Sequence, residues 1–180
     1  MPKRVVRVWI MKFKKTIMKR IINPWLNHDA YYCFGCCDRN ESGVKMEFYA
    51  DGEEVVSYWK PESRFQGWID TLDGGIQAVL LDEICGWAVM LSMQTSGVTS
   101  KMETRYKHAV STNNAYLKLQ AKVTEIKRNI ATVEASLYNE EGVLCTQAVC
   151  TYFTFPKEIV HFPAGKISPG DAVIPNRIPL

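Results

Sequence analysis

The sequence lacks an uninterrupted apolar run of the roughly 18 residues that a membrane-spanning helix requires. It contains only three histidines, His28, His108 and His161, which are scattered, and no serine in a nucleophile-elbow motif. Six cysteines in 180 residues are too few for a dense disulfide framework. We therefore expect mostly reduced thiols in a single-domain cytoplasmic protein, without a histidine-centred set for acyl transfer.

Acidic residues are missing from residues 1–22, which carry eight lysines and arginines. The remainder of the chain holds 14 basic and 19 acidic residues, so its net charge is −5 although the whole chain carries +3. A nucleic-acid-binding domain would carry a basic stripe on the fold itself. The mildly acidic body argues against nucleic acid as a partner.

Three segments differ in composition: a basic N-terminal arm over residues 1–22, a domain over 23–156 and a proline-rich tail over 157–180. Two interpretations of the arm are open. It is a flexible or start-site extension, since Met11 and Met18 are alternative starts, or a basic amphipathic helix that contacts a membrane surface. We favour the extension, and we expect the tail to be a loosely attached coil.

The periodicity of the domain predicts one long helix and six strands. Apolar residues at helical spacing predict the helix over Gly74–Met93, after a long loop over Lys60–Asp73. Two short strands precede it, joined by an Asp51-Gly52 turn, and four more follow it. The strands are expected at Val44–Ala50, Glu53–Trp59, Val98–Lys107, Ala115–Ile126, Ile130–Tyr138 and Val143–Phe155. This order predicts an α+β fold with an antiparallel sheet wrapped around one central helix.

The helix begins with a glycine pair and carries two acids in its middle. Gly74 and Gly75 would leave the unpaired N–H groups of the first helical turn open to an oxygen atom. Asp82 shares a stripe of small residues with Gly75, whereas Glu83 points about 100° away. We therefore predict that Asp82 faces a groove, that Glu83 is solvated, and that Glu83 is the second choice for a catalytic acid.

Three stretches together resemble the hotdog-fold thioesterases of the phenylacetate-type branch: FQGWIDTLDGGIQAVLLDEICGWA, GVTSKMETRYKHAVS and GVLCTQAVCTYFTFP. The resemblance covers roughly Cys33 to Phe155. In that family a His-Gly-Gly step opens the central helix, an acid follows seven residues after the second glycine, and Ser or Thr begins the next strand. Asp82 and Thr99 occupy the acid and hydroxyl positions here.

The resemblance implies a homodimer, with acyl-CoA bound where the two sheets join edge to edge, and leaves open whether dimers pair into tetramers. Asp82 would be the nucleophile or general base, the Gly74-Gly75 backbone would polarise the thioester carbonyl, and Thr99 of the partner chain would orient water. Gln66 lies one residue from the expected place of an amide side chain. The candidate substrate-binding residues are Asp73, Ser100, Arg105 and Lys107. No cofactor is implied.

Asp73 departs from the family pattern, which has histidine at this position. A carboxylate here would oppose the negative charge that develops on the carbonyl oxygen. A non-catalytic acyl-CoA-binding or regulatory protein is therefore the alternative function. A dehydratase on the same fold ranks last, because it pairs a histidine with the helix acid and residues 71–87 contain none.

Cys33, Cys36 and Cys37, with His28 upstream, offer four potential zinc ligands. A structural zinc site normally pairs two separated ligand couples, whereas these four lie within ten residues. We therefore interpret these cysteines as buried or partly exposed thiols and predict no metal site.

Overall fold

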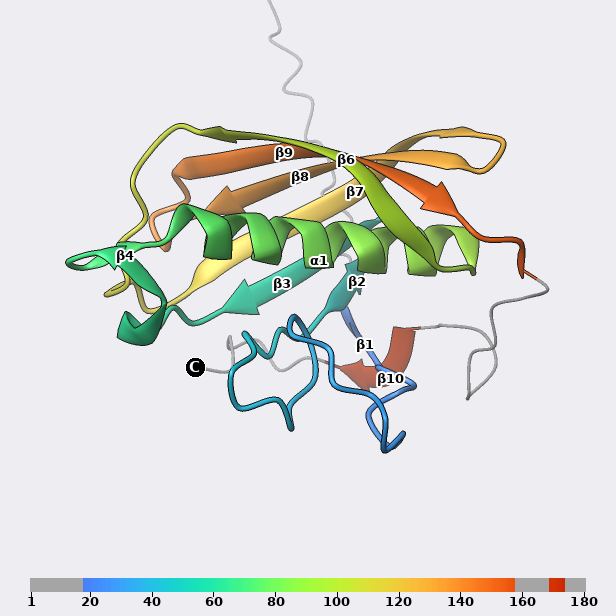
Figure 1. Ribbon diagram of the computed structural model, residues 1–180, viewed down its shortest axis with the longest axis horizontal. Helices are drawn as coiled ribbons and strands as arrows, with labels where there is room; N and C mark the ends of the chain where they lie inside the picture. Colours follow the sequence, from blue (N-terminus) through green and yellow to red (C-terminus); the bar gives the residue numbers. More distant parts are fainter. Residues whose placement is uncertain (1–17, 158–168, 174–180) are drawn as a thin grey trace, which may run out of the picture.

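The 20-residue helix α1 (Gly74–Met93) lies against an eight-stranded antiparallel sheet (Figure 1). The computed structural model describes residues 18–157 and 169–173. The helix has the predicted bounds. Its buried positions, such as Leu80, Ile84 and Trp87, are at most 1% exposed and pack into the single core. By length and composition α1 could cross a membrane, but here it is the core helix of the sheet.

The sheet has the strand order β10-β1-β2-β3-β7-β8-β9-β6, and all its neighbours are antiparallel. Its strands are β1 (Lys19–Ile21), β2 (Tyr49–Asp51), β3 (Glu54–Trp59), β6 (Gly97–Tyr106), β7 (Leu117–Lys127), β8 (Ile130–Tyr138), β9 (Leu144–Thr154) and β10 (Pro169–Val173). The long strands β7 to β9 form the meander that the alternation predicted. With α1 across this sheet, the architecture is the predicted hotdog fold.

Several sequence-based bounds are wrong. The first predicted strand forms only over Tyr49–Asp51, and the turn lies at Gly52-Glu53, where Gly52 has a positive φ of 63°. The predicted loop 60–73 contains a 3-10 helix, η1 (Ser63–Phe65), and a small hairpin of β4 (Gln66–Trp68) and β5 (Thr71–Leu72). This hairpin positions the start of α1, because the Asp73 N–H donates to the carbonyl of Phe65.

Parts of both terminal segments join the sheet. Lys19–Ile21, expected in the arm, forms β1, and Pro169–Val173, expected as coil, forms β10, which pairs with β1. Residues 1–17, 158–168 and 174–180 lie outside the described residues, so the predictions for most of the arm and tail stay predictions.

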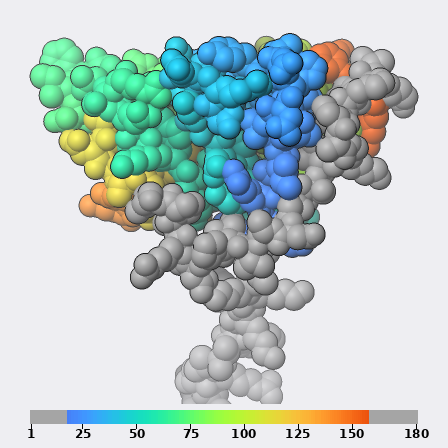
Figure 2. Space-filling view, turned by 90° about the horizontal axis from the view of Figure 1, so that it is seen from below, coloured from blue at the N-terminus to red at the C-terminus, as the bar shows by residue number. Residues whose placement is uncertain are grey.

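Residues 23–48, which we call the Cys segment, cover the side of α1 that carries Trp87. The rings of Phe48 and Trp87 stack with centroids 4.9 Å apart, and Trp25 meets Trp87 edge-on at 6.3 Å. Figure 2 shows this segment, in blue to cyan, beside the green residues that lead into α1. One side of the helix therefore faces the sheet, and another faces an irregular segment rich in cysteine and aromatic residues.

Strand β6 is the edge strand beside β9, and its ten residues are mostly exposed. Val98 and Tyr106 on this strand are both more than half exposed, at 54% and 53%. A long edge strand offers a row of backbone groups for pairing with another strand. The predicted edge-to-edge dimer would use this strand.

Candidate active site

The start of α1 is closed by the side chain of Asp73. Its Oδ1 accepts hydrogen bonds from the backbone N–H groups of Gly75 at 2.7 Å and Ile76 at 3.2 Å. Aspartate is among the best helix N-caps because its carboxylate satisfies N–H groups that have no helical partner. The prediction that the Gly75 N–H is open to a substrate is therefore wrong: the chain's own carboxylate occupies it.

Gly74 is the part of the glycine pair that stays available. Its N–H makes no hydrogen bond to another described residue, and its carbonyl oxygen accepts from the Tyr106 hydroxyl at 2.8 Å. Positive φ values occur at Gly52 and Gly142 among the described glycines, so the pair does not serve an unusual backbone conformation. A Cβ at Gly74 would lie 3.6 Å from the Tyr106 ring, whereas one at Gly75 would lie 2.9 Å from Oδ1 of Asp73.

Two hydroxyl groups hold Asp82 in the middle of α1. The Thr99 hydroxyl donates to Oδ1 of Asp82 at 2.7 Å, and the Tyr152 hydroxyl lies 3.0 Å from the same oxygen and 2.8 Å from the Asp82 carbonyl oxygen. Burial raises the pKa of Tyr152, and the Asp82 charge raises it further, so this phenol stays a protonated donor. The sequence predicted Thr99 from the partner chain, but the chain's own Thr99 makes this contact.

The strand register explains how Thr99 reaches the helix. Thr99 pairs with Tyr152 across β6 and β9, and an irregularity in the register follows before Lys101. A bulge of this kind redirects side chains and is common beside active sites. Asp82, Gly86, Thr99 and Tyr152 line a cleft of about 180 Å³, together with Glu83, Met90, Ser96 and Gly97. The small side of α1 thus faces a groove at Asp82, as its composition suggested.

The two halves of the predicted site lie apart within one chain. Gly75 and Asp82 are separated by seven helical residues, a rise of about 10 Å. One thioester carbonyl cannot contact the N–H of Gly74 and the carboxylate of Asp82 across that span. A single chain therefore offers a polarising backbone group at one place and an oriented carboxylate at another.

Residues 70–146 match the family model described as Thioesterase superfamily. The match spans the helix start, Asp82, Thr99 and most of the strands that hold them. The chain has a hotdog fold, and its residues 70–146 are similar to the thioesterase superfamily. Among curated proteins, no sequence matches it significantly.

Solved structures of thioesterase-superfamily proteins share this fold. Zebra fish thioesterase superfamily member 2 is 27% identical, with a TM-score of 0.56 over 61% of this chain and 81% of its own. A hypothetical thioesterase from Streptococcus pneumoniae TIGR4, solved with coenzyme A, is 23% identical, with a TM-score of 0.54 over 64% of this chain and 81% of its own. A third superfamily protein has a TM-score of 0.60 at 20% identity over 63% of this chain, and the aligned region spans only 56% of that protein.

The remaining residues predicted for this site are spread along its edges. Gln66 is exposed, and its side-chain oxygen accepts from the N–H of Asp70, which places it at the helix start and not at Asp82. Ser100 donates to the carbonyl of Thr151 on β9. Arg105 and Lys107 are exposed beside Tyr106, at the end of β6 that covers Gly74.

The sequence did not predict two tyrosines that contact the candidate site. Tyr106 and Tyr152 each sit in a strand with ordinary alternation, and no local signal distinguishes them from structural aromatics. Their contacts with Gly74 and Asp82 depend on the β6–β9 pairing and on how the helix lies across it.

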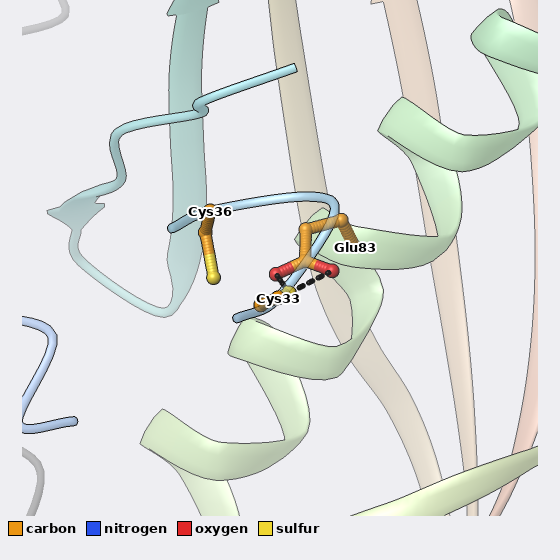
Figure 3. Close-up of side chains that lie close together, drawn as sticks. All are labelled: Cys33, Cys36 and Glu83. Atoms are coloured by element: carbon orange, nitrogen blue, oxygen red, sulfur yellow. Dashed lines mark hydrogen bonds between the residues drawn. The ribbon is translucent and has the colours of Figure 1, made fainter. Parts of the chain in front are cut away.

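Glu83 is not solvated, which corrects the sequence-based expectation. It lies partly buried under the Cys segment, where it accepts from the Trp87 indole at 3.2 Å. Its Oε1 lies 3.5 Å from the Cys33 sulfur (Figure 3). Burial raises the pKa of Glu83 to about 7. The Cys36 thiol donates to the Cys33 sulfur, which lowers the pKa of Cys33 to about 5. The two neighbouring acids of α1 therefore belong to two different clusters.

Proposed function

We propose that this protein hydrolyses acyl-CoA or another acyl thioester at a site that two chains form together. The arrangement of Asp82 carries the proposal: a helix carboxylate fixed by two hydroxyl donors at the wall of a cleft. Both donors meet Oδ1, so Oδ2 can face a water molecule or a carbonyl carbon. The similarity of residues 70–146 to the thioesterase superfamily supports hydrolysis as the reaction of this arrangement.

In this proposal Asp82 acts as general base on water or attacks the thioester carbonyl itself. The donors to Oδ1 hold the carboxylate in one orientation, which both mechanisms require. The Thr99 hydroxyl, 2.7 Å from Oδ1, also lies close enough to orient a water molecule beside the carboxylate. Tyr152 is the buried positioning residue behind this pair.

The polarising group would be the N–H of Gly74 from the partner chain. Since one helix separates its own Gly74 and Asp82 by about 12 Å, a second helix must bring a helix start to the carboxylate. The exposed edge of β6 is the surface by which two sheets could join. Arg105 and Lys107 lie at that edge and could meet the CoA phosphates.

The solved Streptococcus pneumoniae protein supports coenzyme A as the kind of ligand for this fold, since its structure was determined with coenzyme A. Acyl-chain length is set by the groove between the two chains. A panel of acyl-CoAs of increasing length, assayed by free thiol release, tests both the reaction and this preference. Binding of acyl-CoA without turnover across the panel would reject the hydrolase.

Gly74→Pro tests the polarising N–H. Proline is favoured at the first helical position, and the extended backbone of Asp73, with φ −58° and ψ 139°, tolerates a following proline. This variant should therefore keep the helix and lose the N–H. We expect kcat to fall by about 10²- to 10³-fold, the range for one oxyanion donor. Gly74→Ala keeps the N–H and makes only ordinary contact with Tyr106, so it is the matched control.

Mixed dimers test the two-chain site. Chains with Asp82→Asn and chains with Gly74→Pro, co-expressed with different tags, should form heterodimers that hold one complete site. Thiol release should recover in the doubly purified heterodimer and not in either homodimer. Inactive heterodimers would show that the two groups do not act across the interface.

One observation favours the alternative, a non-catalytic acyl-CoA-binding protein. The Asp73 carboxylate accepts the hydrogen bond of the Gly75 N–H. It also lies beside Gly74, where negative charge would develop on the thioester carbonyl oxygen. Asp73→His should raise turnover if this carboxylate limits the reaction. Tight acyl-CoA binding by the wild type without thiol release, together with turnover in Asp73→His, would support the binding protein.

A further inference from the structure

Three potential metal ligands meet where the Cys segment crosses α1. The sulfur atoms of Cys33 and Cys36 and a carboxylate oxygen of Glu83 all lie within 4.8 Å of one another (Figure 3). The Cys33 sulfur is 3.5 Å from Oε1 and 3.6 Å from Oε2 of Glu83. These residues are 50 positions apart in sequence, so the fold brings them together and no linear motif does.

The spacing fits a tetrahedral zinc ion. Zn–S bonds of about 2.3 Å and Zn–O bonds of about 2.0 Å place neighbouring sulfur and oxygen ligands about 3.5 Å apart and two sulfurs about 3.8 Å apart. The observed sulfur–oxygen distances of 3.5 and 3.6 Å already match the first value. Thiolates with a carboxylate are a donor set that zinc accepts.

The Cys-Phe-Gly-Cys loop is held in place by its own backbone. The carbonyl oxygens of Phe34 and Gly35 accept hydrogen bonds from the N–H groups of Val44 and Met46. A Cβ at Gly35 would overlap the Glu83 carboxyl group, so glycine lets the loop lie directly on the helix. Both sulfurs are thus presented to the carboxylate by a fixed loop.

The charge of Glu83 and the outer-shell contact of Cys36 are both compatible with a cation at this place. In the described part of the chain, the ion pairs involve other carboxylates, and Glu83 has only the Trp87 indole and the cysteine thiols as donors. A bound cation would compensate the negative charge of a partly buried carboxylate beside two sulfurs. The Tyr31 hydroxyl lies 2.8 Å from the Cys36 sulfur and would fix that ligand from the outer shell.

We propose that Cys33, Cys36 and Glu83 bind one Zn²⁺, with water in the fourth position, and that the ion ties the Cys segment to α1 beside Asp82. This site differs from the four ligands considered on sequence alone. The Cys37 thiol donates to the Tyr31 carbonyl, and Nδ1 of His28 accepts from Ala30, so neither joins the cluster. The proposal is independent of the proposed hydrolysis, because none of these three ligands takes part in that reaction.

Zinc content and affinity test the proposal on the full chain, purified under reducing conditions. Wild type should hold one zinc per chain after dialysis against trace zinc, measured by inductively coupled plasma mass spectrometry. Cys33→Ser, Cys36→Ser and Glu83→Gln should each weaken zinc binding by more than about tenfold in competition with a chromogenic chelator, since outer-shell changes alone cost that much. Cys37→Ala is the matched control and should bind like wild type.

Cobalt substitution gives a readout that needs no variant. Co²⁺ bound to the wild type should show thiolate-to-cobalt charge transfer and the intense visible bands of a tetrahedral site. A spectrum without thiolate charge transfer overturns the proposal. So does unchanged zinc affinity in Glu83→Gln, or a native Cys33–Cys36 disulfide whose reduction leaves the protein unable to take up zinc.

Discussion

Two adjacent carboxylates on α1 have different hydrogen-bond partners, although both residues line the same cleft. Asp82 faces the sheet edge, where the Thr99 and Tyr152 hydroxyls hold one of its oxygens at the wall of a cleft. Glu83 faces the Cys segment, where two thiols and an indole surround it. One step of about 100° around the helix separates the proposed catalytic acid from the proposed metal ligand. Residue type and sequence position therefore say less about a carboxylate than the partners that its face of the helix meets.

The largest expected effect is a difference in thioesterase activity between variants of Asp82 and variants of Glu83. Asp82→Asn removes the base or nucleophile and keeps the shape, so we expect kcat/KM for the best acyl-CoA to fall by about 100-fold or more. Glu83→Gln should lose far less in the same thiol-release assay. Asp51→Asn, on the distant strand β2, is the control for a neutralised aspartate. Equal losses of activity in the Asp82 and Glu83 variants would contradict a catalytic role for Asp82 alone.

A glycine substitution tests the Glu83 side. Gly35→Ala would push the loop off the Glu83 carboxyl group and break its hydrogen bond to Trp87. We expect the free energy of unfolding to fall by about 1–3 kcal/mol, as for other overpacked sites, measured by urea denaturation. In the double variant Gly35→Ala/Glu83→Ala the penalty of the alanine at 35 should shrink. A strictly additive double-mutant cycle would contradict direct contact.

Tyr152→Phe tests how firmly Asp82 is held. The variant removes one buried donor and leaves Thr99 in place, so we expect a loss of about 1 kcal/mol in stability. A similar loss of orientation at the transition state corresponds to about a tenfold fall in kcat. Thermal denaturation and thiol release measure the two effects. Thr124→Ala, which removes an exposed hydroxyl bonded to β8, should change neither by a comparable amount.

The smallest effect concerns the helix start. Asp73→Ala should cost about 1 kcal/mol of stability because two N–H groups lose their cap, whereas Asp73→Asn should cost almost nothing. The asparagine variant also removes the negative charge beside Gly74, so its kcat should rise while the alanine variant melts earlier. A slower asparagine variant would mean that the Asp73 charge assists the reaction.

The sequence predicted elements with strong periodicity and missed those without it. The helix bounds Gly74–Met93 and the strand Ile130–Tyr138 follow directly from their apolar spacing. The three-residue β1 and the proline-containing β10 carry no such pattern and form only because they pair with each other and with β2. Short strands of this kind are set by tertiary contacts, which local sequence does not encode.

The candidate site divides in the same way. Asp82 and Thr99 could be named from spacing and family resemblance, and they do meet. The cap by Asp73 could also be predicted, since an aspartate directly before a helix is a capping signal. The prediction for Gly75 was wrong because it considered the charge of Asp73 and not its capping hydrogen bond. Tyr152 and the approach of Cys33 to Glu83 required the strand register and a contact across 50 residues.

The contact between Gly35 and Glu83 has a consequence for evolution. A Cβ at position 35 would overlap the Glu83 carboxyl group where it now lies, so a larger residue there requires this side chain to move or to be replaced. Among related sequences, a larger residue at position 35 should accompany a shorter one at position 83, since residues in contact co-vary. Lineages that kept the Cys-x-x-Cys loop should keep both glycine and glutamate, and those that lost the cysteines should be released from this pairing.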